Sequence, residues 1–261
     1  MSEQYDAVVD IQERVEVVDA EDYEYIRPLW KDILLEYFGT LTFVYISLAG
    51  VNQAVLSAGS GAVDQVHVAL CFTLGLTAGI IVAGQSGGHL NPAVSLTMYA
   101  TDSNFNAKRL LGYIVAQVYG GFTAGLLVIS VYYSWINNLK DPETSIGSFG
   151  TLKNDNNSLF SAILDQFIGS ALLMLGAMMT SASWYKPITV GTILGGLGLF
   201  QGTNGFAFNL ARDFGPRAAS AVVFGTEPFT AADYWFWVPA VIPFFGIPFG
   251  WGLHKVLSAL K

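Results

Sequence analysis

The chain has 261 residues, of which 52% are hydrophobic and only 12% are charged, and it carries a formal net charge of −8. Soluble domains carry about 25% charged residues, so this composition excludes an ordinary water-soluble protein and indicates a membrane protein. The single cysteine, Cys71, excludes an intrachain disulfide and a cysteine-based metal site.

The N-terminal segment, residues 1–27, is strongly acidic. It contains nine Asp or Glu residues and two arginines, which account for most of the net negative charge of the chain. It lacks the basic start and apolar core of a signal peptide. We therefore expect a cytosolic tail at 1–29, a membrane domain at 30–257 and a short C-terminal end at 258–261. A regulatory or partner-binding role of the tail stays open.

Six apolar segments are long enough to cross a membrane, because a bilayer core of about 30 Å needs about 20 apolar residues of helix. They are Asp32–Val51, Val66–Ala83, Leu110–Ile136, Leu159–Ala182, Pro187–Phe206 and Tyr234–His254. Two further apolar segments, Asn91–Ala100 and Asn209–Phe224, are too short to cross. We expect both to end halfway through the membrane. Irregular backbone at that depth must be buried in protein or line water, so a cavity is predicted between the full spans.

The two halves of the chain repeat the same order of segments. Residues 30–136 contain three spans, with "HLNPAVS" between the second and the third, and residues 159–257 contain three spans with "FNLARD" at the matching place. Because three is an odd number, the two repeats must lie upside down relative to each other in the membrane. The two half-length helices are then expected to enter from opposite faces and to meet with their N-termini in the middle.

The positions of lysine and arginine predict the orientation, because these residues favour cytoplasmic loops. With both termini inside, the inner segments carry eight such residues and the outer loops carry two, apart from the arginines of the second half-length helix. We therefore expect a multi-pass protein with cytosolic termini. The outer loop after the third span contains the sequon Asn156-Asn157-Ser158, which is either a glycosylation site or a polar loop that matches by chance.

Asn91 and Asn209 stand at the starts of the two half-length helices. Asn is a preferred N-cap and Pro is favoured at the next position, where Pro92 follows Asn91 but Leu210 follows Asn209. We expect both side-chain amides to donate hydrogen bonds into a pore at the membrane midplane. The positive ends of the two helix dipoles would oppose protons and cations there, while neutral hydroxyl-bearing molecules pass. Asparagines that act only as helix caps are the alternative.

The segments before these asparagines are expected to be unwound, with backbone carbonyls that line the pore. Glycines in them let the backbone approach the permeating molecule. The candidates are Gly87, Gly88 and His89 on one side and Asn204, Gly205 and Phe206 on the other. His89 is expected to be a neutral hydrogen-bonding residue and not a proton relay. Glu36, within the first span, is expected to accept hydrogen bonds from the re-entrant backbone.

Arg212 follows Asn209 by three positions. An arginine at membrane depth faces a cavity by default, so we expect its guanidinium to add donors and positive charge to the outer constriction of the pore. The alternative is an arginine that is held only by a salt bridge to Asp213.

The inverted repeat of six spans, together with "SGGHLNPAVS" and "GFAFNLARDFGPR", resembles the major intrinsic protein family of aquaporins and aquaglyceroporins over about residues 29–257. This resemblance implies an all-α membrane protein with six transmembrane helices and two re-entrant half-helices, the aquaporin fold. It also implies a homotetramer surrounded by membrane lipid, with one pore in each subunit, no cofactor, no metal and no nucleic-acid partner.

Within the family, the chain resembles aquaglyceroporins, in particular fungal and protozoan ones. These channels have Asp after the arginine of their selectivity filter, here Asp213. At a filter position in the fifth span they have Gly where water channels have His, and the matching residue is Gly198. The resemblance therefore implies permeation by glycerol.

The same resemblance implies an outer filter of four residues. Three of them are Arg212, Phe206 and Gly198, and the fourth, from the second span, aligns to Phe72 or Cys71, with Phe72 preferred. The chain departs from the family pattern at two supporting positions. Gln166 stands where many members have Glu, and Leu210 replaces the usual Pro.

The expected function is a passive channel in the plasma membrane for glycerol and other small neutral solutes, with some water, that excludes protons and ions. A water-selective aquaporin is the alternative within the family. A secondary transporter would carry more acidic residues inside its spans, and a structural junction protein that has lost conduction would not need Asn91, Asn209 and Arg212. No residue spacing typical of an enzyme active site is present.

Overall fold

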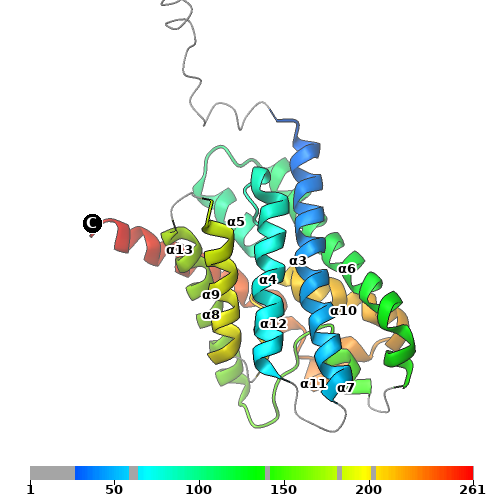
Figure 1. Ribbon diagram of the computed structural model, residues 1–261. Helices are drawn as coiled ribbons and strands as arrows, with labels where there is room; N and C mark the ends of the chain where they lie inside the picture. The colour runs from blue at the N-terminus through cyan, green and yellow to red at the C-terminus, as the bar shows by residue number, and fades with distance from the viewer. Residues whose placement is uncertain (1–26, 59–63, 139–141, 181–183, 201–203, 261) are drawn as a thin grey trace, which may run out of the picture.

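The computed structural model describes residues 27–58, 64–138, 142–180, 184–200 and 204–260, and the acidic tail up to residue 26 lies outside them. In these residues all regular structure is helical (Figure 1). The helices are α3 (Leu29–Ala58), α4 (Gln65–Ala83), α5 (Pro92–Thr101), α6 (Ala107–Asn138), α7 (Pro142–Gly147), α8 (Leu159–Met179), α9 (Lys186–Phe200), α10 (Leu210–Phe224), α11 (Glu227–Tyr234), α12 (Trp237–Val241) and α13 (Pro243–Ser258), with a 3₁₀ turn at Gly84–Ser86.

Four of the described helices, α3, α4, α6 and α8, are long and apolar enough to cross a membrane, and they correspond to the first four expected spans. The fifth expected span, Pro187–Phe206, corresponds to α9, which ends at Phe200. The prediction for this span was therefore wrong at its C-terminal end. Phe206 lies in non-helical chain that leads to α10, where its apolar ring extended the hydropathy pattern without continuing the helix.

The sixth expected span, Tyr234–His254, is divided between α12 and α13. The division falls at Ile242 because the next residue, Pro243, has no backbone N–H to continue the helical hydrogen bonds. Ile242 itself keeps helical angles (φ −61°, ψ −35°), and its carbonyl accepts a hydrogen bond from the Gly246 N–H at 3.1 Å. The two helices therefore form one interrupted span, and its first turn lies at Trp237 and not at Tyr234.

The two repeats pack in matching order. In the first repeat α3 contacts α4 and α6, and in the second α8 contacts α9 and α13. Each half-length helix crosses to the other repeat: α10 packs on α6, and α5 packs on α13. The predicted inverted repeat agrees with this exchange, and hydrogen bonds from Asn91 and Asn209 join the segments at the starts of α5 and α10.

Glycines let these helices approach each other closely. A Cβ atom on Gly215 of α10 would lie 2.8 Å from the Val118 carbonyl oxygen of α6, and one on Gly246 of α13 would lie 2.5 Å from the Phe167 carbonyl oxygen of α8. Small residues at helix crossings allow such close packing inside membranes. The position of α10, which carries part of the candidate site, thus depends on a glycine that faces α6.

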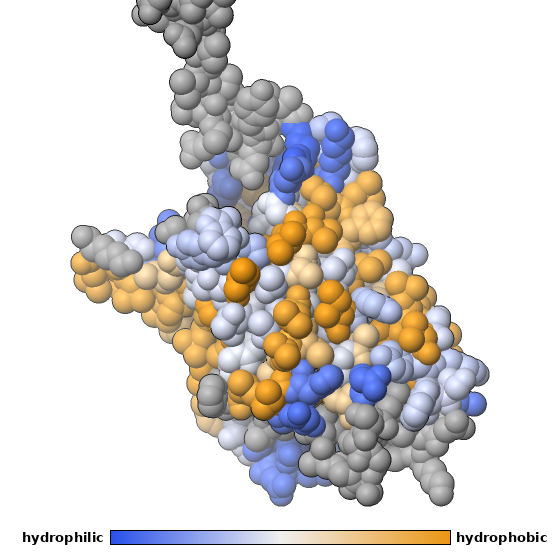
Figure 2. Space-filling model, in the orientation of Figure 1, coloured by the Kyte–Doolittle hydropathy of each residue, from blue (hydrophilic) through white to orange (hydrophobic). Residues whose placement is uncertain are grey.

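The outer surface of the bundle is apolar around its middle. On α4 the side chains of Val66, Leu70 and Leu74 are 64%, 54% and 54% exposed, and their spacing of four residues places them on one helix face. Figure 2 shows apolar residues gathered over the middle of this face of the bundle, with hydrophilic residues toward its two ends. Such a continuous exposed apolar surface is suited to contact with lipid.

Candidate functional site

Asn91 and Asn209 cap the two half-length helices with their side-chain oxygens. The Oδ1 atom of Asn91 accepts a hydrogen bond from the Ala93 N–H at 3.0 Å, and that of Asn209 accepts one from the Ala211 N–H at 2.9 Å. Both asparagines have extended backbone angles, as residues at the N-cap position do. The amide nitrogens therefore point away from the helices that the two residues cap.

The amide nitrogens of these asparagines bind across the repeats. Asn91 Nδ2 donates to the Phe208 carbonyl at 2.9 Å, and Asn209 Nδ2 donates to the Leu90 carbonyl at 2.7 Å. Leu90 and Phe208 have φ angles of 49° and 51°, in the left-handed region that residues other than glycine seldom adopt. An Asn amide has two donors, so each Nδ2 keeps a second N–H for the cavity that both side chains line.

Glu36 holds the segment that leads to Asn91. This carboxylate is fully buried, and it accepts hydrogen bonds from the backbone N–H groups of His89 at 2.9 Å and Leu90 at 2.8 Å. Two further donors, Ser86 Oγ at 2.7 Å and Gln117 Nε2 at 2.8 Å, complete the set. Gln117 and Ser86 were missed by the sequence analysis, because their contact with Glu36 joins three separate helices.

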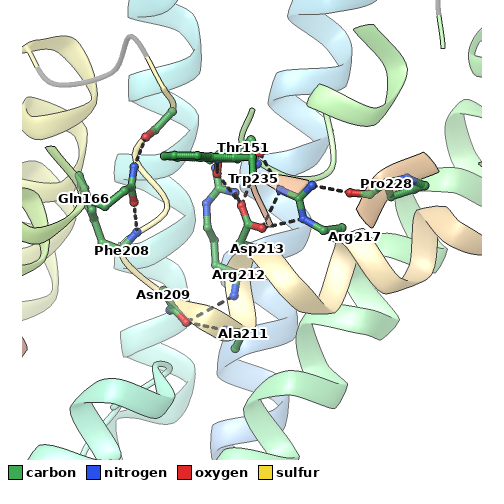
Figure 3. Close-up of polar contacts among 11 residues, drawn as sticks. Thr151, Gln166, Phe208, Asn209, Ala211, Arg212, Asp213, Arg217, Pro228 and Trp235 are labelled. Atoms are coloured by element: carbon green, nitrogen blue, oxygen red, sulfur yellow. Dashed lines mark hydrogen bonds and ion pairs between the residues drawn. The ribbon is translucent and has the colours of Figure 1, made fainter. Parts of the chain in front are cut away.

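Gln166 occupies the equivalent place in the second repeat. Its Nε2 atom donates to the Gly205 carbonyl at 2.6 Å, and its Oε1 atom accepts the Phe208 N–H at 3.4 Å (Figure 3). The side-chain oxygen of Asn204 accepts the Asn154 N–H at 3.1 Å. Asn204 and Gly205 thus contact other parts of the protein, and neither lines the described cavity that reaches Asn209.

A cavity of about 740 Å³ extends from the two asparagines toward the end of the bundle where α3 begins. Gly87, Gly88 and His89 line it, as expected for the segment before Asn91. The lining also includes apolar side chains, among them Leu76, Leu194 and Ile247. The cavity therefore offers both polar backbone groups and hydrocarbon to a molecule inside it.

Four residues meet on the other side of the asparagines: Phe72, Gly198, Phe206 and Arg212, here called the Arg212 cluster. The ring centroids of Phe72 and Phe206 are 4.8 Å apart, and the guanidinium carbon of Arg212 lies 4.6 Å from the Phe72 centroid. A Cβ atom on Gly198 would lie only 2.6 Å from Cζ of Phe206. The structure thus brings all four residues predicted for an outer filter into one place.

Cys71, the alternative to Phe72, lies elsewhere. Its side chain packs against α3, where a Cβ atom on Gly50 would come within 2.2 Å of the Cys71 sulfur. Phe72, in contrast, is 1% exposed and contacts both the aromatic ring and the guanidinium of the Arg212 cluster. The geometry therefore favours Phe72 over Cys71 as the contribution of α4.

The guanidinium of Arg212 has donors without a partner. Arg212 is 5% exposed, and among the described residues its Nε and Nη1 atoms have no hydrogen-bond acceptor. The nearest carboxylate oxygen, Oδ2 of Asp213, lies 3.7 Å from Nη1, beyond hydrogen-bond distance. Buried donors are usually satisfied, so these atoms are suited to bind water or the hydroxyl groups of a solute.

Asp213 is instead bound by Arg217 and by the segment that follows α7. Its Oδ2 atom accepts the Thr151 N–H at 2.7 Å, and its Oδ1 atom contacts Arg217 Nε at 2.9 Å and Nη2 at 2.8 Å. Arg217 also donates to the carbonyls of Thr151 at 2.6 Å and Pro228 at 2.7 Å (Figure 3). Arg217 and Thr151 were not predicted as site residues, although the spacing of four between Asp213 and Arg217 was a usable signal.

Several known proteins are similar in sequence to this chain. Residues 25–251 match the model of the family described as "Major intrinsic protein". Aquaglyceroporin-3 of Trypanosoma brucei brucei is 32% identical over 245 residues, which cover 88% of this chain and 79% of the relative. Aquaglyceroporin-2 of Rhizophagus irregularis is 33% identical over 251 residues (90% and 79%), and Aquaporin-10 of Homo sapiens is 31% identical over 249 residues (89% and 82%).

A solved structure shares the fold. The X-ray structure of the aquaglyceroporin from Plasmodium falciparum matches with a TM-score of 0.78 at 28% identity, and the match covers 89% of this chain and 98% of that chain. The sequence resemblance and the predicted fold are both confirmed by these findings. The chain belongs to the major intrinsic protein family, and it is an all-helical, multi-pass membrane channel with the aquaporin fold and not an enzyme.

Proposed function

We propose that the chain is a passive channel for glycerol and other small neutral solutes, with some water, and that the Arg212 cluster is its selectivity filter. The observation that carries this proposal is the contact between Gly198 and Phe206. Even a Cβ atom at position 198 would lie 2.6 Å from the Phe206 ring. The ring therefore takes the space beside Gly198 that the side chain of a larger polar residue would need. A polyol can place its CH groups on this ring while Arg212 binds its hydroxyl groups.

The cavity supports the same class of solute. Gly87 and Gly88 line it together with apolar side chains that include Leu194 and Ile247. Glycerol has hydroxyl groups along one edge and CH groups along the other, so it can match both kinds of lining at once. Water has no CH groups to place against the apolar side chains of the cavity.

The groups at the centre of the pore account for the exclusion of ions and protons. Asn91 and Asn209 have their oxygens bound to their own helices, so only N–H donors face the cavity. The N-terminal ends of α5 and α10 add positive partial charge at the same place. A cation is opposed there, and an oxygen that accepts both amide donors cannot pass a proton along a continuous water chain.

Two buried carboxylates, Glu36 and Asp213, are already bound by protein groups, which argues against ion-coupled transport through them. Glu36 accepts hydrogen bonds from four donors. Asp213 accepts a hydrogen bond from Thr151 and forms an ion pair with Arg217. The relatives named aquaglyceroporins agree with a glycerol channel. By the same family resemblance we expect a homotetramer in the plasma membrane. The bases at the end where α3 begins, Lys31, Arg109 and Lys186, support cytosolic termini.

Uptake of radiolabelled glycerol into vesicles with the purified protein tests this function. We expect uptake to rise in proportion to glycerol concentration and to be unchanged by proton or sodium gradients. Saturable uptake that depends on a gradient would support a secondary transporter instead. Vesicles that swell in response to water but take up no glycerol would support a water-selective channel.

Leu210→Pro is expected to leave transport nearly unchanged. Asn209 caps α10 normally despite the missing proline, and its extended backbone (φ −160°, ψ 117°) is compatible with a following Pro. Leu210 is the first helical residue, whose N–H has no acceptor within the helix, so Pro is tolerated there. Glycerol and water fluxes of the variant and wild type check this in parallel. A several-fold change would show that Leu210 shapes the centre of the pore.

A further inference from the structure

Asp213 forms ion pairs with two arginines but is hydrogen-bonded to only one of them. Arg217 approaches its Oδ1 atom to 2.8 Å, whereas Arg212 stays 3.7 Å from its Oδ2 atom (Figure 3). All three residues are buried, at 1% exposure for Asp213, 0% for Arg217 and 5% for Arg212. Attraction between charges is strong in such surroundings, so the choice between the two arginines needs a structural reason.

The reason is that several acceptors fix the position of the Arg217 guanidinium. Its guanidinium donates to Asp213 and to the carbonyls of Thr151 and Pro228, which lie before and after it in the sequence on separate segments. The backbone of Gly150 lies against the same guanidinium, since a Cβ atom there would lie 2.5 Å from Arg217 Nη2. The planar guanidinium therefore meets three acceptors at once, which a flexible lysine amine cannot match.

We propose that Arg217 is a positioning residue that sets the selectivity of the channel by satisfying Asp213, so that the guanidinium of Arg212 keeps its donors for the permeating solute. This inference deepens the proposed function, because it assumes that Arg212 binds solute hydroxyl groups. It differs from a purely structural role for Arg217, which would affect folding but not the discrimination between glycerol and water.

Without Arg217, the nearest cation to Asp213 is Arg212. A shift of less than about 1 Å would bring Arg212 Nη1 from 3.7 Å to the distance of a charge-assisted hydrogen bond with Asp213. The guanidinium would then leave the face of Phe72, where it now lies 4.6 Å from the ring centroid. Its donors would turn from the pore to the carboxylate, and the filter would lose its binding groups for hydroxyls.

The test compares Arg217→Met, Arg217→Lys and the double variant Asp213→Asn/Arg217→Met, each purified and reconstituted as the full chain. In Arg217→Met we expect glycerol permeability to fall at least about tenfold, the effect of losing a hydrogen bond to a charged group. Water permeability should fall less, so the glycerol-to-water ratio drops. The double variant removes the competing carboxylate and should restore the ratio. Arg217→Lys keeps the charge but loses the planar guanidinium, so it should give a ratio between those of Arg217→Met and the wild type.

Lys153→Met is the matched control, because Lys153 lies two residues from Thr151 and donates to the Asn154 carbonyl instead of Asp213. It should leave the glycerol-to-water ratio unchanged. A double variant with the same low ratio as Arg217→Met, or an equal loss in Lys153→Met, would overturn the inference.

A structure of Arg217→Met separates this inference from the proposed function. We expect the distance from Arg212 Nη1 to Asp213 Oδ2 to shorten to about 2.9 Å, whichever solute the channel carries. An unchanged distance of 3.7 Å would overturn the inference even if the wild type transports glycerol. Wild-type vesicles that exclude glycerol, combined with a shortened distance in the variant, would refute the proposed function but uphold the role of Arg217.

Discussion

Gly198→His is expected to abolish most glycerol transport while the protein still folds and inserts. The Cβ atom alone would lie 2.6 Å from Cζ of Phe206, so the ring must move toward Phe72 and Arg212 or the helix α9 must shift. Overpacking of this kind costs about 1–3 kcal/mol. If this cost raises the barrier to the passage of glycerol, flux drops about fivefold to a hundredfold, because 1.4 kcal/mol is a factor of ten. Water, which is smaller, should lose less.

A matched pair of alanine variants isolates this contact. Gly198→Ala adds only the clashing Cβ atom, whereas Gly196→Ala adds the same atom two residues earlier on α9, where no heavy atom lies within 4 Å. Stopped-flow light scattering of vesicles gives both permeabilities. We expect glycerol flux to be reduced in Gly198→Ala and unchanged in Gly196→Ala. Equal glycerol fluxes in the two variants would contradict a filter whose width depends on Gly198.

Glu36→Ala is expected to destabilise the whole channel. It would leave three donors without an acceptor: the backbone N–H groups of His89 and Leu90 and one N–H of Gln117 Nε2. Ser86 Oγ can still donate to the Ala83 carbonyl, and the other N–H of Gln117 to Ser95 Oγ. Each unsatisfied buried donor costs about 1–3 kcal/mol, so the loss in the free energy of unfolding should be at least about 3 kcal/mol. Because Leu90 presents the carbonyl that binds Asn209, water and glycerol fluxes should fall together.

Thermal unfolding in detergent and flux in vesicles check this prediction. Glu36→Gln is the control, since an amide keeps one acceptor oxygen and should give an intermediate loss of stability. If Glu36→Ala unfolds at the wild-type temperature and keeps its fluxes, the segment before Asn91 does not depend on Glu36. A selective loss of glycerol flux alone would also contradict the prediction, because this carboxylate supports the common centre of the pore.

The features that the sequence could predict are local ones. The asparagine, proline and glycine residues at the starts of α5 and α10 determine the caps and the unwound segments through their own backbone preferences. The odd number of spans in each repeat required an inverted arrangement, and the observed exchange of α5 and α10 between repeats agrees with it. The fold could therefore be derived from short patterns and one topological argument.

What the sequence could not predict depends on contacts between distant segments. Phe206 has the hydropathy of a lipid-facing residue, and its hydropathy shows neither that α9 ends at Phe200 nor that its ring contacts Phe72 and Gly198. Arg217 carries the same charge as Arg212, but its acceptors on Thr151 and Pro228 lie 66 and 11 residues away along the chain. Hydropathy and helix periodicity carry no information about such pairings, so the division of roles between the two arginines came only from the structure.

The most direct test of the central claim is a stopped-flow comparison of water, glycerol, urea and sorbitol permeabilities in vesicles that contain the wild-type protein. The account predicts that glycerol and urea enter far faster than in empty vesicles, that water also passes, and that sorbitol, the bulkiest of these solutes, is slowest. Rapid water movement with glycerol entry no faster than in empty vesicles would contradict it.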